Sequence, residues 1–201
     1  MASEPSYYEN LEPLEFWDLH KSKIIAYGSL ALLAAIAYSV YAIQSQNREN
    51  AARALYAEAT TPADYQAVIE KASGSVVAGD ASLQLADSLR SEKKYDEAIA
   101  TLREFIDREP KHPLISGAWL SLATTFELQG KTDEAIASYQ KTASQFPTAY
   151  SAPLAKMGEA RLLAASGKKE EARMVYENIM AQHPESPVVR EAQRELIFLK
   201  Q

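Results

Sequence analysis

The amino-acid sequence predicts an all-α fold in which a single N-terminal transmembrane helix is followed by an α-solenoid of helix–turn–helix repeats. Two observations support this prediction. Residues 24–43 form a run of twenty residues without a charge. Beyond that run, similar stretches return every 37 residues, a period within the 20–50 residues typical of stacked repeat units.

The charge-free run, IIAYGSLALLAAIAYSVYAI, has the length of a membrane span. At about 1.5 Å per residue, a helix of twenty residues matches the ~30 Å hydrocarbon core of a bilayer. Aromatic side chains lie near both ends of the run, where the membrane–water interface favours them: Phe16, Trp17, Tyr38 and Tyr41. We therefore expect residues 24–43 to cross a membrane, preceded by a short tail of residues 1–23.

A cleaved signal peptide is the main alternative for this segment. Val40 and Ala42 are small enough to form a cleavage site before Ile43. The run is longer than the usual 7–15 apolar residues of a signal peptide, however, and an acidic tail precedes it. A buried core helix fits less well, because it would normally show a polar face. We therefore favour an uncleaved anchor.

Flanking lysines indicate the orientation of the span. Lys21 and Lys23 lie closer to the run than Arg48 and Arg53 do. Cationic residues accumulate on the cytoplasmic side of membrane spans. We therefore expect a cytoplasmic N-terminus and a translocated C-terminal domain.

The repeat is clearest in three stretches: KKYDEAIATL (93–102), GKTDEAIASY (130–139) and GKKEEARMVY (167–176). Each predicted unit contains two helix-length pieces separated by a turn at Gly130 or Gly167 and at the matching position of the first copy. Such units bury their apolar faces only against one another. The repeat domain, residues 44–201, divides into a degenerate unit 47–78, units 79–115, 116–152 and 153–187, and a lone capping helix 188–201.

Small residues and prolines recur at fixed columns of the repeat. Alanine at a helix crossing lets two backbones approach closely, and proline ends a helix because it cannot continue the hydrogen-bond ladder. The recurring columns are Ala86, Ala123 and Ala160; Ala98, Ala135 and Ala172; and Pro110, Pro147 and Pro184. These columns determine how the helices pack and where they end, and they do not indicate a catalytic site.

This pattern resembles the tetratricopeptide repeat, W-x2-L-G-x2-Y, then A-x3-F, then P. The second copy carries it as Trp119, Leu122, Ala123, Phe126, Gly130, Ala135, Tyr139 and Pro147. The third copy departs from it, because Lys156 and Glu159 occupy columns that are usually apolar. The resemblance implies a solenoid that binds other proteins.

In the tetratricopeptide family the first helix of each unit lines the concave face. The resemblance therefore implies a partner-binding groove with an apolar row and two rows of mixed charge. These rows are Leu83, Leu120 and Met157; Asp87, Thr124 and Arg161; and Arg90, Glu127 and Ala164. Without a clamp of cations for a terminal carboxylate, the groove suits a helix or an extended peptide. The alternative is that neighbouring helices cover these residues.

The layout of the whole chain resembles the YfgM-type ancillary subunits of the bacterial Sec translocon, which have one span and a periplasmic repeat domain. This resemblance implies a scaffold in the bacterial inner membrane. Its partners would be translocon subunits, a membrane-anchored periplasmic chaperone or exported polypeptides. A cytosol-facing receptor of the import-receptor type and an envelope-assembly scaffold are the alternatives.

Composition excludes several other classes. The net charge of −6 and the lack of clustered Lys and Arg disfavour nucleic-acid binding. The absence of cysteine excludes thiol nucleophiles and Cys-based metal sites, and His20, His112 and His183 are far apart. No nucleophile–base pair or phosphate loop is evident. We therefore expect no enzyme activity, no cofactor, no metal and no small-molecule substrate.

Overall fold

The computed structural model describes residues 13–199, and every element in that part of the chain is an α-helix. The chain divides into two compact units, with the boundary between Arg48 and Glu49. This boundary lies close to the predicted end of the membrane span at residue 43. Residues 1–12 of the predicted tail and residues 200–201 of the predicted capping helix lie outside the described residues.

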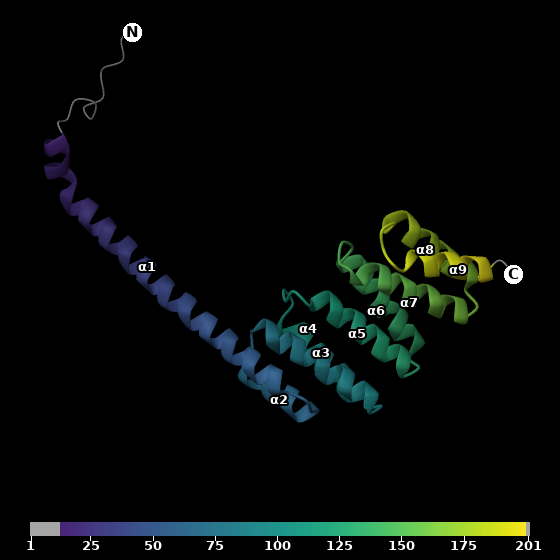
Figure 1. Ribbon diagram of the computed structural model, residues 1–201. Coiled ribbons are helices and arrows are strands. Elements are labelled where there is room, and N and C mark those ends of the chain that lie inside the picture. Colours follow the sequence, from purple (N-terminus) through teal and green to yellow (C-terminus); the bar gives the residue numbers. More distant parts are fainter. Residues whose placement is uncertain (1–12, 200–201) are drawn as a thin grey trace, which may run out of the picture. The chain divides into compact units, whose positions relative to one another are not determined.

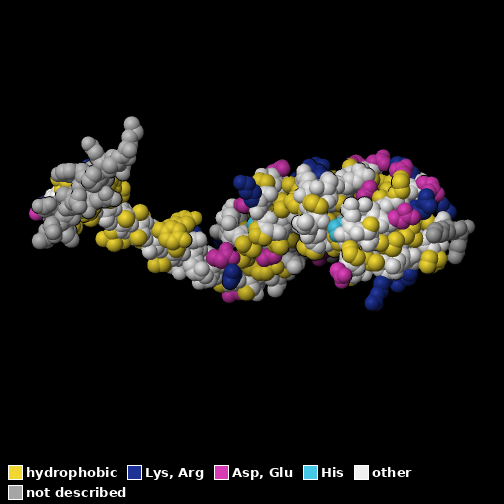
Figure 2. All heavy atoms as spheres, turned by 90° about the horizontal axis from the view of Figure 1, so that it is seen from above, with side chains coloured by type: hydrophobic (Ala, Val, Ile, Leu, Met, Phe, Trp, Pro, Cys, Tyr) yellow, Lys and Arg dark blue, Asp and Glu magenta, His cyan; other side chains and the backbone are white. Residues whose placement is uncertain are grey.

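Helix α1, Pro13–Glu58, contains the whole charge-free run and extends beyond it on both sides (Figure 1). Large apolar side chains of the run are exposed all round the helix, among them Ile25, Leu30, Leu33 and Tyr38. Figure 2 shows hydrophobic side chains along this helix, whereas acidic and basic side chains are interspersed over the repeat helices. The segment from Phe16 is long and apolar enough to cross a membrane, and its apolar window is not buried within the structure.

The second unit, residues 49–201, is a stack of helices that pack in chain order. First helices alternate with second helices of 14 residues each. The helices are α2 (Pro62–Lys71), α3 (Val76–Ser91), α4 (Tyr95–Arg108), α5 (Ile115–Leu128), α6 (Thr132–Gln145), α7 (Ser151–Ala165), α8 (Lys169–Gln182) and α9 (Val189–Leu199). The helices pair as α3 with α4, α5 with α6 and α7 with α8, and each first helix begins before its predicted unit: α3 at Val76 rather than 79, α5 at Ile115 rather than 116 and α7 at Ser151 rather than 153.

The first helices form an inner layer. Helix α5 contacts both α3 and α7 in addition to its neighbours in the chain. The second helices α4, α6 and α8 pack against this layer from the other side. The first helices α3, α5 and α7 are therefore neighbours in the stack.

The turn inside each unit repeats the same hydrogen bonds. Lys131 N–H donates to the Phe126 carbonyl, and Gly130 N–H donates to the Glu127 carbonyl. This pair of bonds is a Schellman motif, which requires a left-handed residue after the helix. Gly130 and Gly167 both have φ of +80°. The turn therefore lies where the sequence predicts it.

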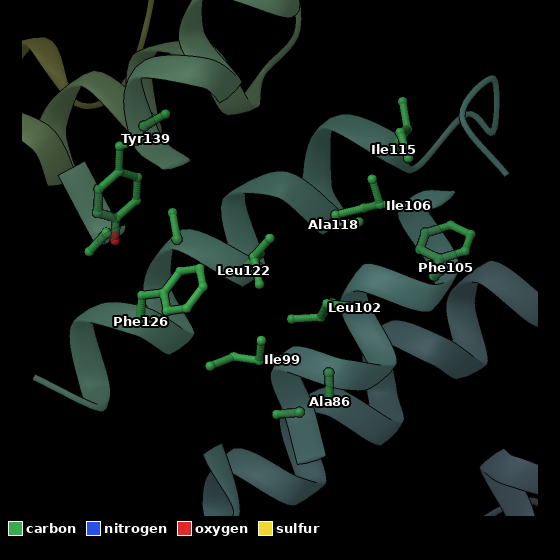
Figure 3. Close-up of a cluster of buried hydrophobic side chains, with 14 of the residues drawn as sticks. Ala86, Ile99, Leu102, Phe105, Ile106, Ile115, Ala118, Leu122, Phe126 and Tyr139 are labelled. Carbon is green, nitrogen blue, oxygen red and sulfur yellow. The ribbon is translucent and has the colours of Figure 1, made fainter. Parts of the chain in front are cut away.

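The recurring alanines lie at helix crossings. Ala86, Ala98, Ala123 and Ala135 are each fully buried. Figure 3 shows the larger side chains between these crossings, with Leu102, Leu122 and Phe126 filling the space between neighbouring helices. A larger residue at the alanine columns would force the helix pairs apart.

The two ends of the stack differ. Residues 49–58 of α1 add Ala52 and Tyr56 to a small core with Val68 of α2 and Val77 of α3. At the other end, α9 buries Leu196, but Phe198 is exposed. The predicted capping helix therefore does not present a wholly polar outer side.

Candidate protein-binding surface

The predicted apolar row is interrupted in the third unit. Leu83 and Leu120 are partly exposed and also pack on the central core. Met157 is only 6% exposed and packs in the core of the third unit with Ala160, Leu163 and Val188. The expectation that Met157 faces a partner is therefore corrected: neighbouring helices and the loop before α9 cover it.

The structure brings residues of the two charged rows together. Their opposite charges form ion pairs within the chain. Arg90 donates to Asp87 one helical turn earlier at 2.6 Å. It also donates to the Ser121 hydroxyl of the next first helix at 2.8 Å. Arg90 therefore ties α3 to α5 and is not free to bind an anionic partner.

A second set of hydrogen bonds joins the second and third units. Arg161 of α7 donates to Glu127 of α5 at 2.6 Å. The Tyr139 hydroxyl of α6 donates to the other Glu127 oxygen at 2.7 Å and lies 3.3 Å from the Thr124 hydroxyl. Thr124, Glu127 and Arg161, all predicted as groove residues, thus meet in one network.

Burial and neighbouring charges determine the pKa values of the side chains in this network. Burial, together with the neighbouring Glu127 carboxylate, raises the pKa of Tyr139 to about 12. Burial alone would lower the pKa of Arg161, but Glu127 beside it holds that pKa above its usual value. The network therefore consists of a neutral phenol and a compensated ion pair.

Tyr139 is buried and supports this network, and Leu128 is exposed at the end of α5; neither residue was assigned to the surface from the sequence. The Tyr139 ring lies against the backbone of Gly158, where an added Cβ would come within 2.5 Å of a ring carbon. Leu128, the last residue of α5, is 52% exposed and follows Glu127 directly. Its position next to a predicted groove residue could have indicated it; the role of Tyr139 depends on contacts across three helices.

The histidines do not form a metal site. His112 is buried against Gly79 and the edge of the Phe105 ring, and its Nδ1 accepts from the Leu114 N–H at 3.1 Å. Within residues 13–199, no cluster of three or more His, Asp or Glu side chains could hold a metal ion. His112 serves as packing between the α4–α5 loop and α3.

Comparison with protein families identifies the repeat. The model of the tetratricopeptide repeat-like domain matches residues 15–200, almost the whole chain. The chain belongs to this family. Its tetratricopeptide repeat-like fold is typical of non-enzymatic scaffolds that bind other proteins. No curated protein matches the chain.

Solved structures with the same fold include two crystal structures of tetratricopeptide-like repeats from a Podosopora anserina kinesin light chain, one of them a variant form. Both are 17% identical to this chain and cover 78% of it. The alignments cover 84% and 85% of those chains, with TM-scores of 0.52 and 0.51. At this level of identity the likeness concerns the fold alone.

Proposed function

We propose that the chain is a membrane-anchored tetratricopeptide repeat scaffold that binds protein partners in the bacterial cell envelope. Residues 24–43 span the inner membrane, the N-terminus is cytoplasmic and residues 44–201 form a periplasmic binding domain. The observation that carries this proposal is the charge-free part of α1, whose large apolar side chains are exposed among the described residues. Exposed apolar surface of this extent is stable in lipid and not in water.

The proposed role is that of an ancillary subunit at the site of protein export. One span followed by a tetratricopeptide repeat-like domain is the layout of the YfgM-type subunits of the Sec translocon. The proposed partners are translocon subunits, a membrane-anchored periplasmic chaperone or exported polypeptides. An envelope-assembly scaffold of the same topology would differ in its partner only.

The inner layer is the proposed binding surface. Leu83, Leu120 and Leu128 offer partly or fully accessible apolar contacts, while Arg90 and Arg161 are each held by a carboxylate of the chain itself. Burying an aliphatic side chain contributes about 1.5–3 kcal/mol, and an exposed ion pair usually contributes less than ~1 kcal/mol. The surface therefore favours an apolar helix or extended segment over an anionic tail.

The topology can be tested with single cysteines, because the chain has none of its own. Ser6→Cys marks the N-terminus and Lys111→Cys marks the exposed loop between α4 and α5. A membrane-impermeant maleimide is added to spheroplasts. We expect labelling at residue 111 before lysis and at residue 6 only after lysis.

The same experiment separates the alternatives. The reverse labelling pattern would indicate a cytosol-facing receptor. Release of the protein by alkaline carbonate, or a mature N-terminus near Ile43, would show that residues 24–43 are not an anchor. Each of these results contradicts the proposed topology in a different way.

A further inference from the structure

Two columns of the repeat that hold apolar residues in the second unit hold charged residues in the third unit. In the second unit, α5 packs Trp119 and Leu122 into the core that it shares with the second helices. Thirty-seven residues later these columns hold Lys156 and Glu159 of α7. Leu122 is buried in the apolar core, so the stacking of units does not require a charge in this column.

Glu159 is a buried carboxylate with only one satisfied oxygen. Its side chain is 9% exposed, and Oε1 accepts a hydrogen bond from Gln140 Nε2 of α6 at 2.8 Å. Within the described chain, Oε2 has no hydrogen-bond partner, yet it is not sealed from solvent. Burial raises the pKa of Glu159, and Gln140 and Lys156 offset part of that rise.

Lys156 compensates the Glu159 charge only in part. Its ammonium donates to the side-chain carbonyl oxygens of Asn178 and Gln182, both on α8. Two of its three protons are thus used on neutral acceptors. The negative charge of Glu159 is therefore not paired with a cation by a direct hydrogen bond within the described residues.

Glu159 lines a groove of about 360 Å³ between α7 and α8. Leu163 and Val175 form apolar lining, Glu171 adds a second carboxylate and Met174 is 58% exposed. Counting Lys156, the groove carries two negative charges and one positive charge. It therefore combines a net negative charge with an aliphatic surface.

We propose that this outer groove binds a lysine or arginine side chain of a protein partner, as a second interaction surface separate from the inner layer. The cationic head group donates to Glu159 Oε2 and lies near Glu171. Its aliphatic stem packs on Met174 and Val175, as long basic side chains do on apolar surfaces. Binding gives Glu159 Oε2 a charge-assisted hydrogen bond, which no side chain of the described residues supplies.

The proposal can be tested on the full-length chain in detergent micelles. The probes are two blocked 15-residue alanine-based helical peptides, one with a central arginine and one with its uncharged isostere citrulline. Methionine methyl groups carry a ¹³C label, with Met174 in the groove and Met157 in the core as the internal reference. We expect the arginine peptide to shift the Met174 resonance saturably and to bind roughly tenfold more tightly than the citrulline peptide, since a charge-assisted hydrogen bond is lost.

Variants at residue 159 separate binding from folding. Glu159→Gln keeps the shape, and Glu159→Leu restores the apolar residue of the matching columns. We expect both variants to lose the arginine preference, and Glu159→Leu to melt at a higher temperature than the parent. Leu128→Asp, on the inner layer, should leave peptide binding at the groove unchanged.

Two results would overturn the proposal. One is equal affinity for the arginine and citrulline peptides, and the other is an unchanged arginine preference in a folded Glu159→Leu variant. Neither result bears on the inner layer or on the membrane anchor. A groove that does not bind basic side chains can therefore be distinguished from a chain that lacks the proposed scaffold function.

Discussion

Lys93 adopts a left-handed conformation that its two counterparts in the repeat reach with glycine. Its φ is +61°, and Gly130 and Gly167 follow at intervals of 37 residues. The same pair of Schellman hydrogen bonds closes all three turns. A residue with a side chain is strained in this conformation, whereas glycine is not.

Lys93→Gly is therefore expected to stabilise the repeat domain by roughly 0.5–1 kcal/mol, after allowing for the greater freedom of glycine in the unfolded chain. Denaturant unfolding measures this change. Gly130→Ala is the matched control and should destabilise the domain. A Lys93→Gly variant that unfolds at the same or lower denaturant concentration would contradict the role of the turn.

Tyr176 provides a second prediction at the scale of single residues. It matches Tyr139 in the repeat, but among the described residues its buried hydroxyl has no hydrogen-bond partner. Glu127, the acceptor for Tyr139, is replaced in this column by Ala164. Burial, together with the negative charge of Glu195, raises the pKa of Tyr176 to about 12.

The raised tyrosine pKa values make the fold sensitive to alkali. The folded state keeps phenol protons that the unfolded chain loses above a pKa of about 10. The free energy of unfolding should therefore be unaffected below pH 10 and fall as the pH rises from 10 toward 12. Tyr176→Phe should reduce this fall, as measured by unfolding at a series of pH values. An unchanged slope in that variant would contradict the assignment.

At the scale of helices, the alanine crossings determine the spacing of each pair. Ala135 of α6 is fully buried in the central core. Ala135→Leu should overpack the crossing and destabilise the stack by roughly 1–3 kcal/mol. Thermal unfolding followed by far-UV circular dichroism tests this. A variant that melts no lower than its parent would show that the pair is not closely packed there.

The helices and turns were predictable because they depend on local features of the sequence. Glycine at 130 and 167 ends a first helix, and alanine returns at each crossing. The burial of Met157 was not predictable, because it depends on packing against α8 and the segment leading to α9. Lys156 and Glu159 were recognised as departures from the pattern, but their partners on α6 and α8 could be found only from the structure.

The same distinction applies to the binding surface. Thr124, Glu127 and Arg161 were assigned to it by register, and the structure brings them into one network with Tyr139. Register gives the face of a helix on which a residue lies, but not the partners that cover or neutralise it. The network therefore joins neighbouring units and does not present free charges to a partner.

At the scale of the whole molecule, one chain combines a candidate membrane-spanning helix with a stack of tetratricopeptide repeat-like helices. The central claim is that the inner layer of the anchored stack holds a protein partner in the envelope. Leu128, at the end of the first helix α5, is 52% exposed. Ala137, exposed on the second helix α6, provides a control position.

The most direct test places a photoreactive amino acid at residue 128 or residue 137 of the full-length chain in native membranes. Covalent adducts are then identified by mass spectrometry after irradiation. We expect residue 128 to crosslink to a translocon subunit, a membrane-anchored chaperone or an exported polypeptide, and residue 137 to give none of these adducts. Adducts from residue 137 alone, or the same adducts from both positions, would contradict the claim that the inner layer is the binding surface.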